Sequence, residues 1–186
     1  MRMRWIVAVV GALGLAAVAV TSLMPWTRTS DPHADDAHAV SADACPADAK
    51  PANLNFTLKD MNNREVSLTE YKGKVVLLDF WATWCGPCKV EIPWFVEYQD
   101  RYGKDGLQVV GVSVDDTLDL LTPFVGEMKM NYPVLQGLGN DQILEAYGPV
   151  VGLPTTVLIS REGKVCATHA GLISKETFEA QIKKLL

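Results

Sequence analysis

Two cysteines separated by two residues, Cys85 and Cys88, are the best-placed pair for chemistry in this sequence. The apolar run 74–81 (KVVLLDFW) precedes them and predicts a strand buried on both faces, and residues 87–102 predict a helix. A thiolate at a helix N-terminus faces unpaired N–H groups and the positive end of the helix dipole. Both stabilise the anion, so we expect Cys85 to be the nucleophile and Cys88 the resolving thiol.

The residues around the pair suit an exposed redox site. Gly86 lets a partner chain approach closely, and Pro87 fits the first turn of a helix. We expect Trp84 to contact partner proteins and Trp81 to belong to the core.

The same pair has other interpretations. A static disulfide or half of a zinc site is one, but zinc needs a second ligand pair, and Cys45, Cys166 and His169 are isolated in the sequence. A Cu(I) metallochaperone could use the two thiolates of Cys85 and Cys88 as ligands. A non-redox binding domain would keep the fold and ignore the cysteines, which the intact WCGPC segment disfavours.

The elements that must position this pair follow from the hydrophobic pattern of residues 52–186. Short alternating runs around a turn predict an N-terminal hairpin, continuous apolar runs predict buried strands, and Ser174 is a suitable N-cap for the last helix. The predicted strands are 55–58, 65–68, 74–81, 107–114, 155–160 and 164–169, and the predicted helices are 87–102, 118–130, 140–147 and 174–186. This order describes an α/β fold with a mixed sheet.

The segment 79–89 (DFWATWCGPCK) resembles the active-site segment of thioredoxin, and 152–156 (GLPTT) resembles the thioredoxin loop that carries a cis-proline. The chain is more similar still to the TlpA/ResA branch of membrane-anchored, extracytoplasmic proteins. The N-terminal apolar run, the CKVEIP segment and the long stretch 116–154 carry this resemblance. It implies a thioredoxin-like fold, with a central mixed sheet flanked by helices, an N-terminal β-hairpin and a central helix–strand insertion.

The resemblance also assigns roles to particular residues. Leu153, Pro154 and Thr155 would shape the substrate groove, together with Trp84, Gly86 and Pro87. Glu91, three residues after Cys88, and Asp79, inside the apolar run, would manage protons. Many members of the branch lack an acid at the position of Asp79, whereas thioredoxin has one.

A buried carboxylate is a plausible acceptor for the proton of Cys88. Asp79 lies in VVLLDFW, where burial should raise its pKa. The alternatives are that Asp79 is a satisfied polar group of the core, and that Glu91 is an exposed helix residue paired with a lysine.

The N-terminal part of the chain differs in composition from the rest. Residues 5–24 form an uncharged run of twenty residues preceded by two arginines, long enough to cross a bilayer of about 30 Å with the remainder exported. We predict a membrane anchor at 1–24; the alternative is a cleaved signal peptide, whose apolar region is usually shorter. Residues 25–51, rich in Ala, Asp and Pro, predict a flexible linker, and residues 52–186 a single domain.

Cys45 and Cys166 remain as a second pair. In an oxidising compartment two leftover cysteines tend to pair, so we predict a disulfide between them; the alternative is two free thiols.

Composition and resemblance together set the expected function. The net charge of −5, from 17 basic and 22 acidic residues, gives no basis for nucleic-acid binding. We expect a monomeric protein-disulfide reductase outside the cytoplasmic membrane of a bacterium, with no metal or organic cofactor. The resemblance implies apocytochrome c or a copper-delivery protein as client, and a transmembrane electron donor of the DsbD/CcdA kind.

Overall fold

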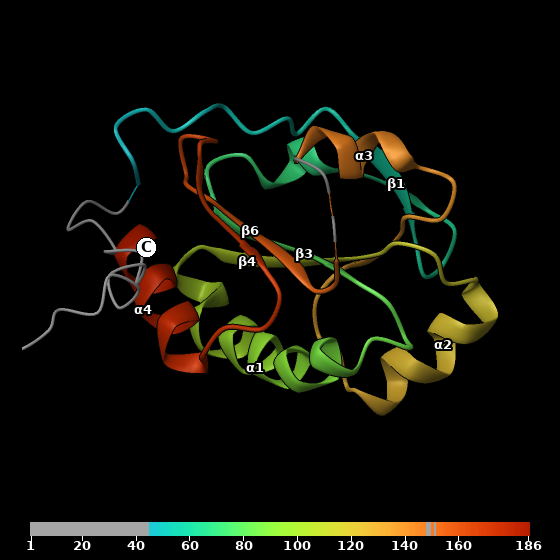
Figure 1. The fold of residues 1–186 in the computed structure, drawn as a ribbon. Helices are drawn as coiled ribbons and strands as arrows, with labels where there is room; N and C mark the ends of the chain where they lie inside the picture. Colours follow the sequence, from blue (N-terminus) through green and yellow to red (C-terminus); the bar gives the residue numbers. More distant parts are fainter. Residues whose placement is uncertain (1–44, 148–149, 151) are drawn as a thin grey trace, which may run out of the picture. The chain divides into compact units, whose positions relative to one another are not determined.

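Residues 45–147, 150 and 152–186 are described in the computed structural model of the chain (Figure 1). The strands are β1 (Thr57–Asp60), β2 (Glu65–Ser67), β3 (Val75–Trp81), β4 (Leu107–Ser113), β5 (Val134–Gln136), β6 (Thr155–Ile159) and β7 (Val165–Ala170). The helices are α1 (Gly86–Tyr102), α2 (Leu118–Glu127), α3 (Asp141–Ala146) and α4 (Lys175–Leu185), with short 3-10 turns η1 (Leu68–Tyr71) and η2 (Gly103–Asp105).

The strands form one mixed sheet in the order β2-β1-β5-β4-β3-β6-β7. β3 pairs in parallel with β4, and β4 in parallel with β5, whereas β6 runs antiparallel to both β3 and β7. The hairpin β1–β2 joins the sheet through antiparallel pairing of β1 with β5. The predicted fold class is therefore confirmed, including the N-terminal hairpin and the inserted strand β5.

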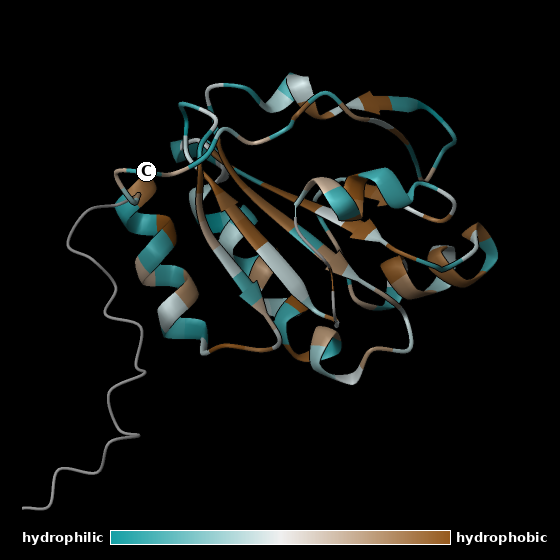
Figure 2. Cartoon of the chain, turned by 45° about the horizontal axis from the view of Figure 1, so that its top comes forward, coloured by the Kyte–Doolittle hydropathy of each residue, from teal (hydrophilic) through white to brown (hydrophobic). Residues whose placement is uncertain are grey.

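Strand β3 is buried along its whole length because the sheet is covered on both faces. Val75, Leu77 and Trp81 pack under α1, α2 and α4, while Val76, Leu78 and Phe80 pack under α3 and η1. Figure 1 shows α1, α2 and α4 below the sheet and α3 above it. In Figure 2 the central strands are mainly hydrophobic, whereas the helices carry hydrophilic residues on their outer sides.

Two helix ends differ in how well the sequence predicts them. Ser174 caps α4 as expected, because its side chain accepts a hydrogen bond from the N–H of Thr177. Helix α2 ends at Glu127 instead of continuing to residue 130. Lys129 there has a left-handed φ of 52°, and the N–H of Met130 donates back to the carbonyl of Val125, which closes the helix.

The chain enters the domain along β7. The N–H of Ala52 donates to the carbonyl of Gly163, and the N–H of Val165 donates to the carbonyl of Lys50. A disulfide joins Cys45 to Cys166 just beyond this pairing. The predicted anchor at 1–24 and most of the predicted linker lie outside the described residues, and within those residues no helix is both long and apolar enough to span a bilayer.

Candidate active site

The cysteine pair lies where β3 gives way to α1. Cys85 is the N-cap residue of α1, and its Sγ accepts a hydrogen bond from the N–H of Cys88 at 3.2 Å. The two cysteines are joined by a disulfide, so the structure shows the oxidised form. Cys85 retains 3% exposure while Cys88 has none, which leaves the sulfur of Cys85 as the one that a client can reach. Pro87 occupies the first turn of α1, as predicted.

A buried aspartate at the end of β4 holds the loop that precedes Cys85. The carboxylate of Asp116 accepts hydrogen bonds from the N–H of Thr83 at 2.8 Å and from its hydroxyl at 2.6 Å. The Ser113 hydroxyl donates to the same carboxylate at 2.7 Å. The loop therefore has a fixed position relative to the sheet, which in turn fixes the N-terminus of α1.

Trp84 is the most exposed large apolar side chain of the described residues, at 65%. Its indole N–H donates to the Asp115 carboxylate at 3.1 Å, so the ring is held at the surface beside Cys85 and not buried. Trp81, in contrast, is fully buried and stacks on Phe124 with 5.2 Å between the ring centroids. These positions fit the expectation of one contact residue and one core residue.

The second loop of the site leads into β6. The peptide bond between Leu153 and Pro154 is cis, and the Thr155 hydroxyl donates to the carbonyl of Gly152 at 2.8 Å. Thr155 pairs with Phe80 near the C-terminal end of β3, which brings this loop to the end of the sheet where α1 begins. Leu153 is half-buried and packs against the core cluster that contains both active-site cysteines. The structure thus brings together the predicted groove residues from two distant segments.

Two carboxyl groups lie fully buried behind the cysteines. Asp79 points from the middle of β3 towards α1, between Gly111 on β4 and Thr156 on β6, and Glu91 follows Cys88 by one turn of α1. Neither carboxyl group has a hydrogen-bond partner among the described protein atoms.

Burial is the largest cause of the altered proton affinity of this pair. It raises the pKa of Asp79 to about 7, and it raises the pKa of Glu91 as well, to which the neighbouring Asp79 charge adds. The two acids therefore hold at least one proton between them at neutral pH. Glu91 is not the solvated helix residue of the alternative interpretation, and Asp79 is not a satisfied polar group of the core.

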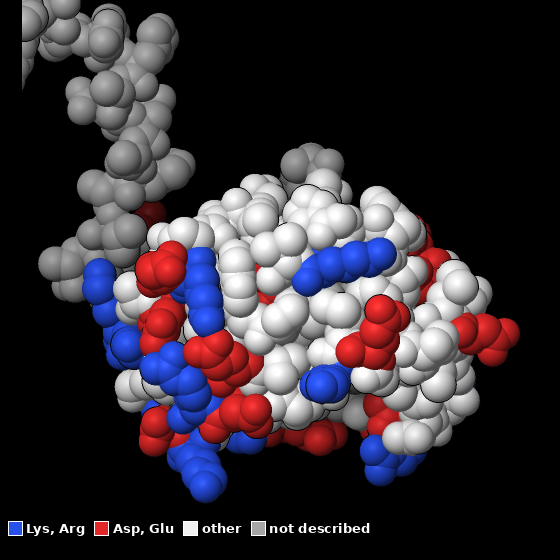
Figure 3. Space-filling model, turned by 90° about the horizontal axis from the view of Figure 1, so that it is seen from below, with Lys and Arg blue, Asp and Glu red and all other residues white. Residues whose placement is uncertain are grey.

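Charged side chains gather away from the cysteines. Figure 3 shows the face formed by α1, α2 and α4, where charges of both signs cluster on the left, over α4, and much of the remainder is uncharged. The ion pairs at this end link α1 to α4 through Lys175–Glu97 and Arg101–Glu179. These exposed pairs each contribute little to stability.

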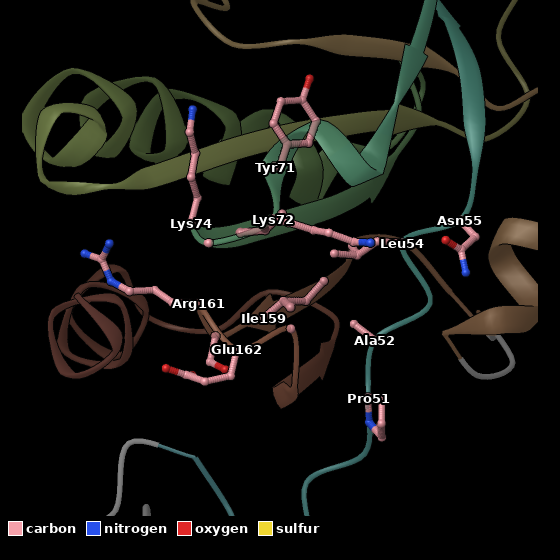
Figure 4. Close-up of a pocket in the computed structure, with 14 residues that line it drawn as sticks. Pro51, Ala52, Leu54, Asn55, Tyr71, Lys72, Lys74, Ile159, Arg161 and Glu162 are labelled. Carbon is pink, nitrogen blue, oxygen red and sulfur yellow. The ribbon is translucent and has the colours of Figure 1, made fainter.

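A groove of about 420 Å³ lies at the opposite end of the sheet (Figure 4). Its lining includes Lys74 just before β3, Ile159 at the end of β6 and Arg161 after that strand. Both of these cations are already engaged, Lys74 with Gln108 and Arg161 with the carbonyls of Asp105 and Leu186. None of the residues that line the groove belongs to the segments that carry the cysteines or the cis-proline.

Asp115 and Asp116 are site residues that the sequence analysis missed. Two adjacent acids directly after the predicted strand 107–114 were the available signal. Their partners Thr83 and Trp84 lie more than thirty residues earlier, so the contacts depend on the parallel pairing of β3 with β4.

A thioredoxin-like sheet with an N-cap cysteine pair and a cis-proline loop at the same end of its central strands defines the class of thiol–disulfide oxidoreductases. The sequence matches the AhpC/TSA family over residues 49–168. It is 37% identical to the thiol-disulfide oxidoreductase ResA of Geobacillus thermodenitrificans over 131 residues, which are 70% of this chain and 74% of that protein. Identity to ResA of Bacillus subtilis is 38% over 122 residues, covering 65% of this chain and 66% of that protein.

Among solved structures, a putative thiol:disulfide interchange protein DsbE from Chlorobium tepidum is similar, with a TM-score of 0.66 and 34% identity. The match covers 74% of this chain and 99% of that one. The chain belongs to the AhpC/TSA family, and its activity is thiol–disulfide exchange. The predicted resemblance is confirmed, and the comparisons do not favour the metallochaperone alternative.

Proposed function

We propose that the protein is a membrane-tethered reductant of disulfides in client proteins, acting outside the cytoplasmic membrane through Cys85 and Cys88. The observation that carries this proposal is the placement of the pair at the start of α1, where Cys85 retains a small exposure and Cys88 is fully buried one turn before the buried Glu91. The helix N-terminus favours the thiolate of Cys85 in the reduced enzyme.

The reaction consists of two exchanges. The Cys85 thiolate attacks one sulfur of the client disulfide, forms a mixed disulfide, and releases the other client sulfur as a thiolate that takes up a proton. Cys88 then loses its proton to the Asp79–Glu91 pair and attacks Cys85, which expels the second client thiolate. The client gains two electrons and two protons, and the enzyme is left with the Cys85–Cys88 disulfide. No metal or organic cofactor takes part.

The client binds at the end of the sheet where the loop before α1 meets the loop before β6. Trp84 offers an exposed apolar surface that Asp115 orients, and Gly86 has open space around it. Leu153, Pro154 and Thr155 form the other wall, where the backbone of Leu153 can pair with an extended peptide.

The setting of the reaction rests on the family resemblance. The clients are apocytochrome c or a copper-delivery protein, and a DsbD/CcdA-type membrane protein returns electrons to the oxidised pair. The uncharged run 5–24 tethers a monomeric domain on the outer side of a bacterial cytoplasmic membrane.

The direction of electron flow can be tested by the redox potential. Gly86-Pro87 is also the dipeptide of thioredoxin, whose potential is about −270 mV. Equilibration of the full chain with glutathione buffers should place the Cys85–Cys88 couple near that value. A potential above about −150 mV would make the protein an oxidant and overturn the proposal.

Clients and location can be tested with one variant. Cys88→Ala removes the resolving thiol, so the full chain expressed in a bacterial host should accumulate mixed disulfides through Cys85, and these should stay in the membrane fraction after a carbonate wash. The matched control is Cys85→Ala/Cys88→Ala, which should trap nothing. Equal adducts on both variants would contradict the assigned roles, and a soluble product lacking the first 25–50 residues would reject the anchor.

A further inference from the structure

Buried polar atoms without a hydrogen-bond partner are concentrated in one place in this protein. Among the described residues they are the carboxylate oxygens of Asp79 and Glu91, the indole nitrogen of Trp81, and the hydroxyls of Tyr132 and Thr156. We call these five residues the buried polar cluster. Leaving a buried polar group unpaired is unfavourable, so native proteins pair nearly all of them with each other or with internal water.

The strand register shows why these groups meet. Gly111, Asp79 and Thr156 lie abreast on β4, β3 and β6, on the face that α1 covers. A Cβ atom on Gly111 would lie 2.8 Å from the indole nitrogen of Trp81 and 3.4 Å from Cε2 of Tyr132. The ring edge of Tyr132 that carries its hydroxyl therefore lies over the position next to Asp79, in space that the glycine leaves open.

Titratable side chains belong to the buried polar cluster or lie next to it along the described elements. They are Asp79 from β3, Cys88 and Glu91 from α1, and Tyr132 from the segment before β5. The facing residues of β4 and β6, Gly111 and Thr156, do not titrate at ordinary pH.

Tyr132 is 6% exposed, and burial together with the nearby acids raises its pKa well above the ordinary value. Its hydroxyl therefore keeps its proton and can act as a donor.

We propose that Tyr132 is a positioning residue for the exchange reaction: its hydroxyl hydrogen-bonds to the Asp79–Glu91 pair through an internal water molecule, and sets the pH at which the pair can accept the proton of Cys88. This inference rests on the proposed function, in which these acids take that proton. The indole N–H of Trp81, which can only donate, also lies beside Gly111 without a partner and is a second donor for the same water-filled space.

The direction of the effect follows from which form a donor stabilises. A hydrogen bond donated to a carboxylate stabilises the ionised form over the neutral acid, so it lowers the pH at which the pair loses its first proton. With Tyr132 in place, the pair carries one proton and one negative charge near neutral pH and can accept a second proton. Without the hydroxyl, the pair stays doubly protonated to a higher pH and cannot take the proton of Cys88.

The test is the pH profile of the second exchange, measured on the full chain. Cys85 is loaded with an aromatic thiol as a mixed disulfide, and the release of that thiol by Cys88 is followed by absorbance. Tyr132→Phe should move the midpoint of the profile upward by about one pH unit, and slow release about tenfold below the midpoint. Tyr147→Phe is the matched control, because its hydroxyl donates to the carbonyl of Asn53 on the opposite face of the sheet. It should leave the profile unchanged.

Two further measurements keep the proposal testable if Tyr132→Phe folds poorly. Fluorotyrosine placed at position 132 is a stronger donor and should move the midpoint downward. Carboxyl-carbon NMR titration of the resting protein should show the titration midpoints of Asp79 and Glu91 moving upward in Tyr132→Phe and downward in the fluorotyrosine variant. An unchanged midpoint and unchanged resonances would overturn the role of Tyr132. If Asp79→Asn still alters the profile in that case, the proposed function stands, whereas failure of wild-type Cys88 to release the thiol would refute the proposed function itself.

Discussion

Replacing Asp79 with Asn is expected to make the protein more stable than wild type at pH 8 and slower to close the Cys85–Cys88 disulfide. Burial raises the pKa of Asp79 from 3.8 to about 7, so the folded protein binds this proton more tightly than the unfolded chain does. The favourable contribution of the neutral acid is complete below about pH 4 and is lost as the pH rises through about 7. Above that range a charge is held in an apolar site, and Asn removes it with little change of shape.

The expected gain at pH 8 is on the order of 4 kcal/mol in the free energy of unfolding, because each of the roughly three pKa units between 3.8 and about 7 corresponds to about 1.4 kcal/mol. Denaturant unfolding of the full chain between pH 4 and 8 should show the difference shrinking as the pH falls. Asp105→Asn is the control, because Asp105 is exposed on η2 and should give the same difference at every pH. If Asp79→Asn is only as stable as wild type at pH 8, then the buried charge of Asp79 does not destabilise the folded protein.

The same variant should slow the second exchange by about 10- to 100-fold, because Cys88 loses a proton acceptor. Glu91→Gln should slow it too. If both acids share one proton, the double variant should be less impaired than the product of the two single effects predicts. An Asp79→Asn protein that exchanges at the wild-type rate would assign the proton to Glu91 alone or to water.

The parts of the fold that depend on local pattern were predictable. The run VVLLDFW gave β3, and the position of Ser174 before an amphipathic segment gave the start of α4, because hydrophobic burial and capping act within a few residues. The predicted helix 87–102 matches α1 closely, because Pro93 lies inside the helix without ending it. The early end of α2 was not, because the left-handed backbone at Lys129 has no strong residue signal.

The sequence predicts the site residues that lie within one continuous segment. It does not predict the contacts that form between distant segments of the sheet. The spacing of Cys85 and Cys88 predicts the redox pair, and the family resemblance predicts the role of Pro154. The contacts of Asp116 with Thr83, and of Tyr132 with the space over Gly111, arise from strand register and from the absence of a side chain on a distant strand. A sequence pattern does not contain that information, so Tyr132, which stands between predicted elements, gives no signal of its own.

Removing the disulfide between Cys45 and Cys166 should lower the free energy of unfolding substantially and leave the exchange chemistry intact. The bond closes a loop with a sequence separation of 121, and in the chain-entropy model a loop of that size contributes up to about 5 kcal/mol by restricting the unfolded state. Cys166 lies near the start of β7, whereas it is the far end of that strand, at Ala170, that pairs with Thr155 beside the active site. The rate at which Cys85 reduces a small disulfide should therefore stay within a factor of about two, since surface changes away from a site have small effects.

Three variants separate the disulfide from the packing of its two side chains. Cys45→Ala, Cys166→Ala and the double variant should lose the same stability, because removal of either sulfur breaks the same bond, and non-reducing peptide mapping of wild type should yield one fragment that joins both positions. Additive losses, or full alkylation of both thiols without reductant, would show that the bond is absent.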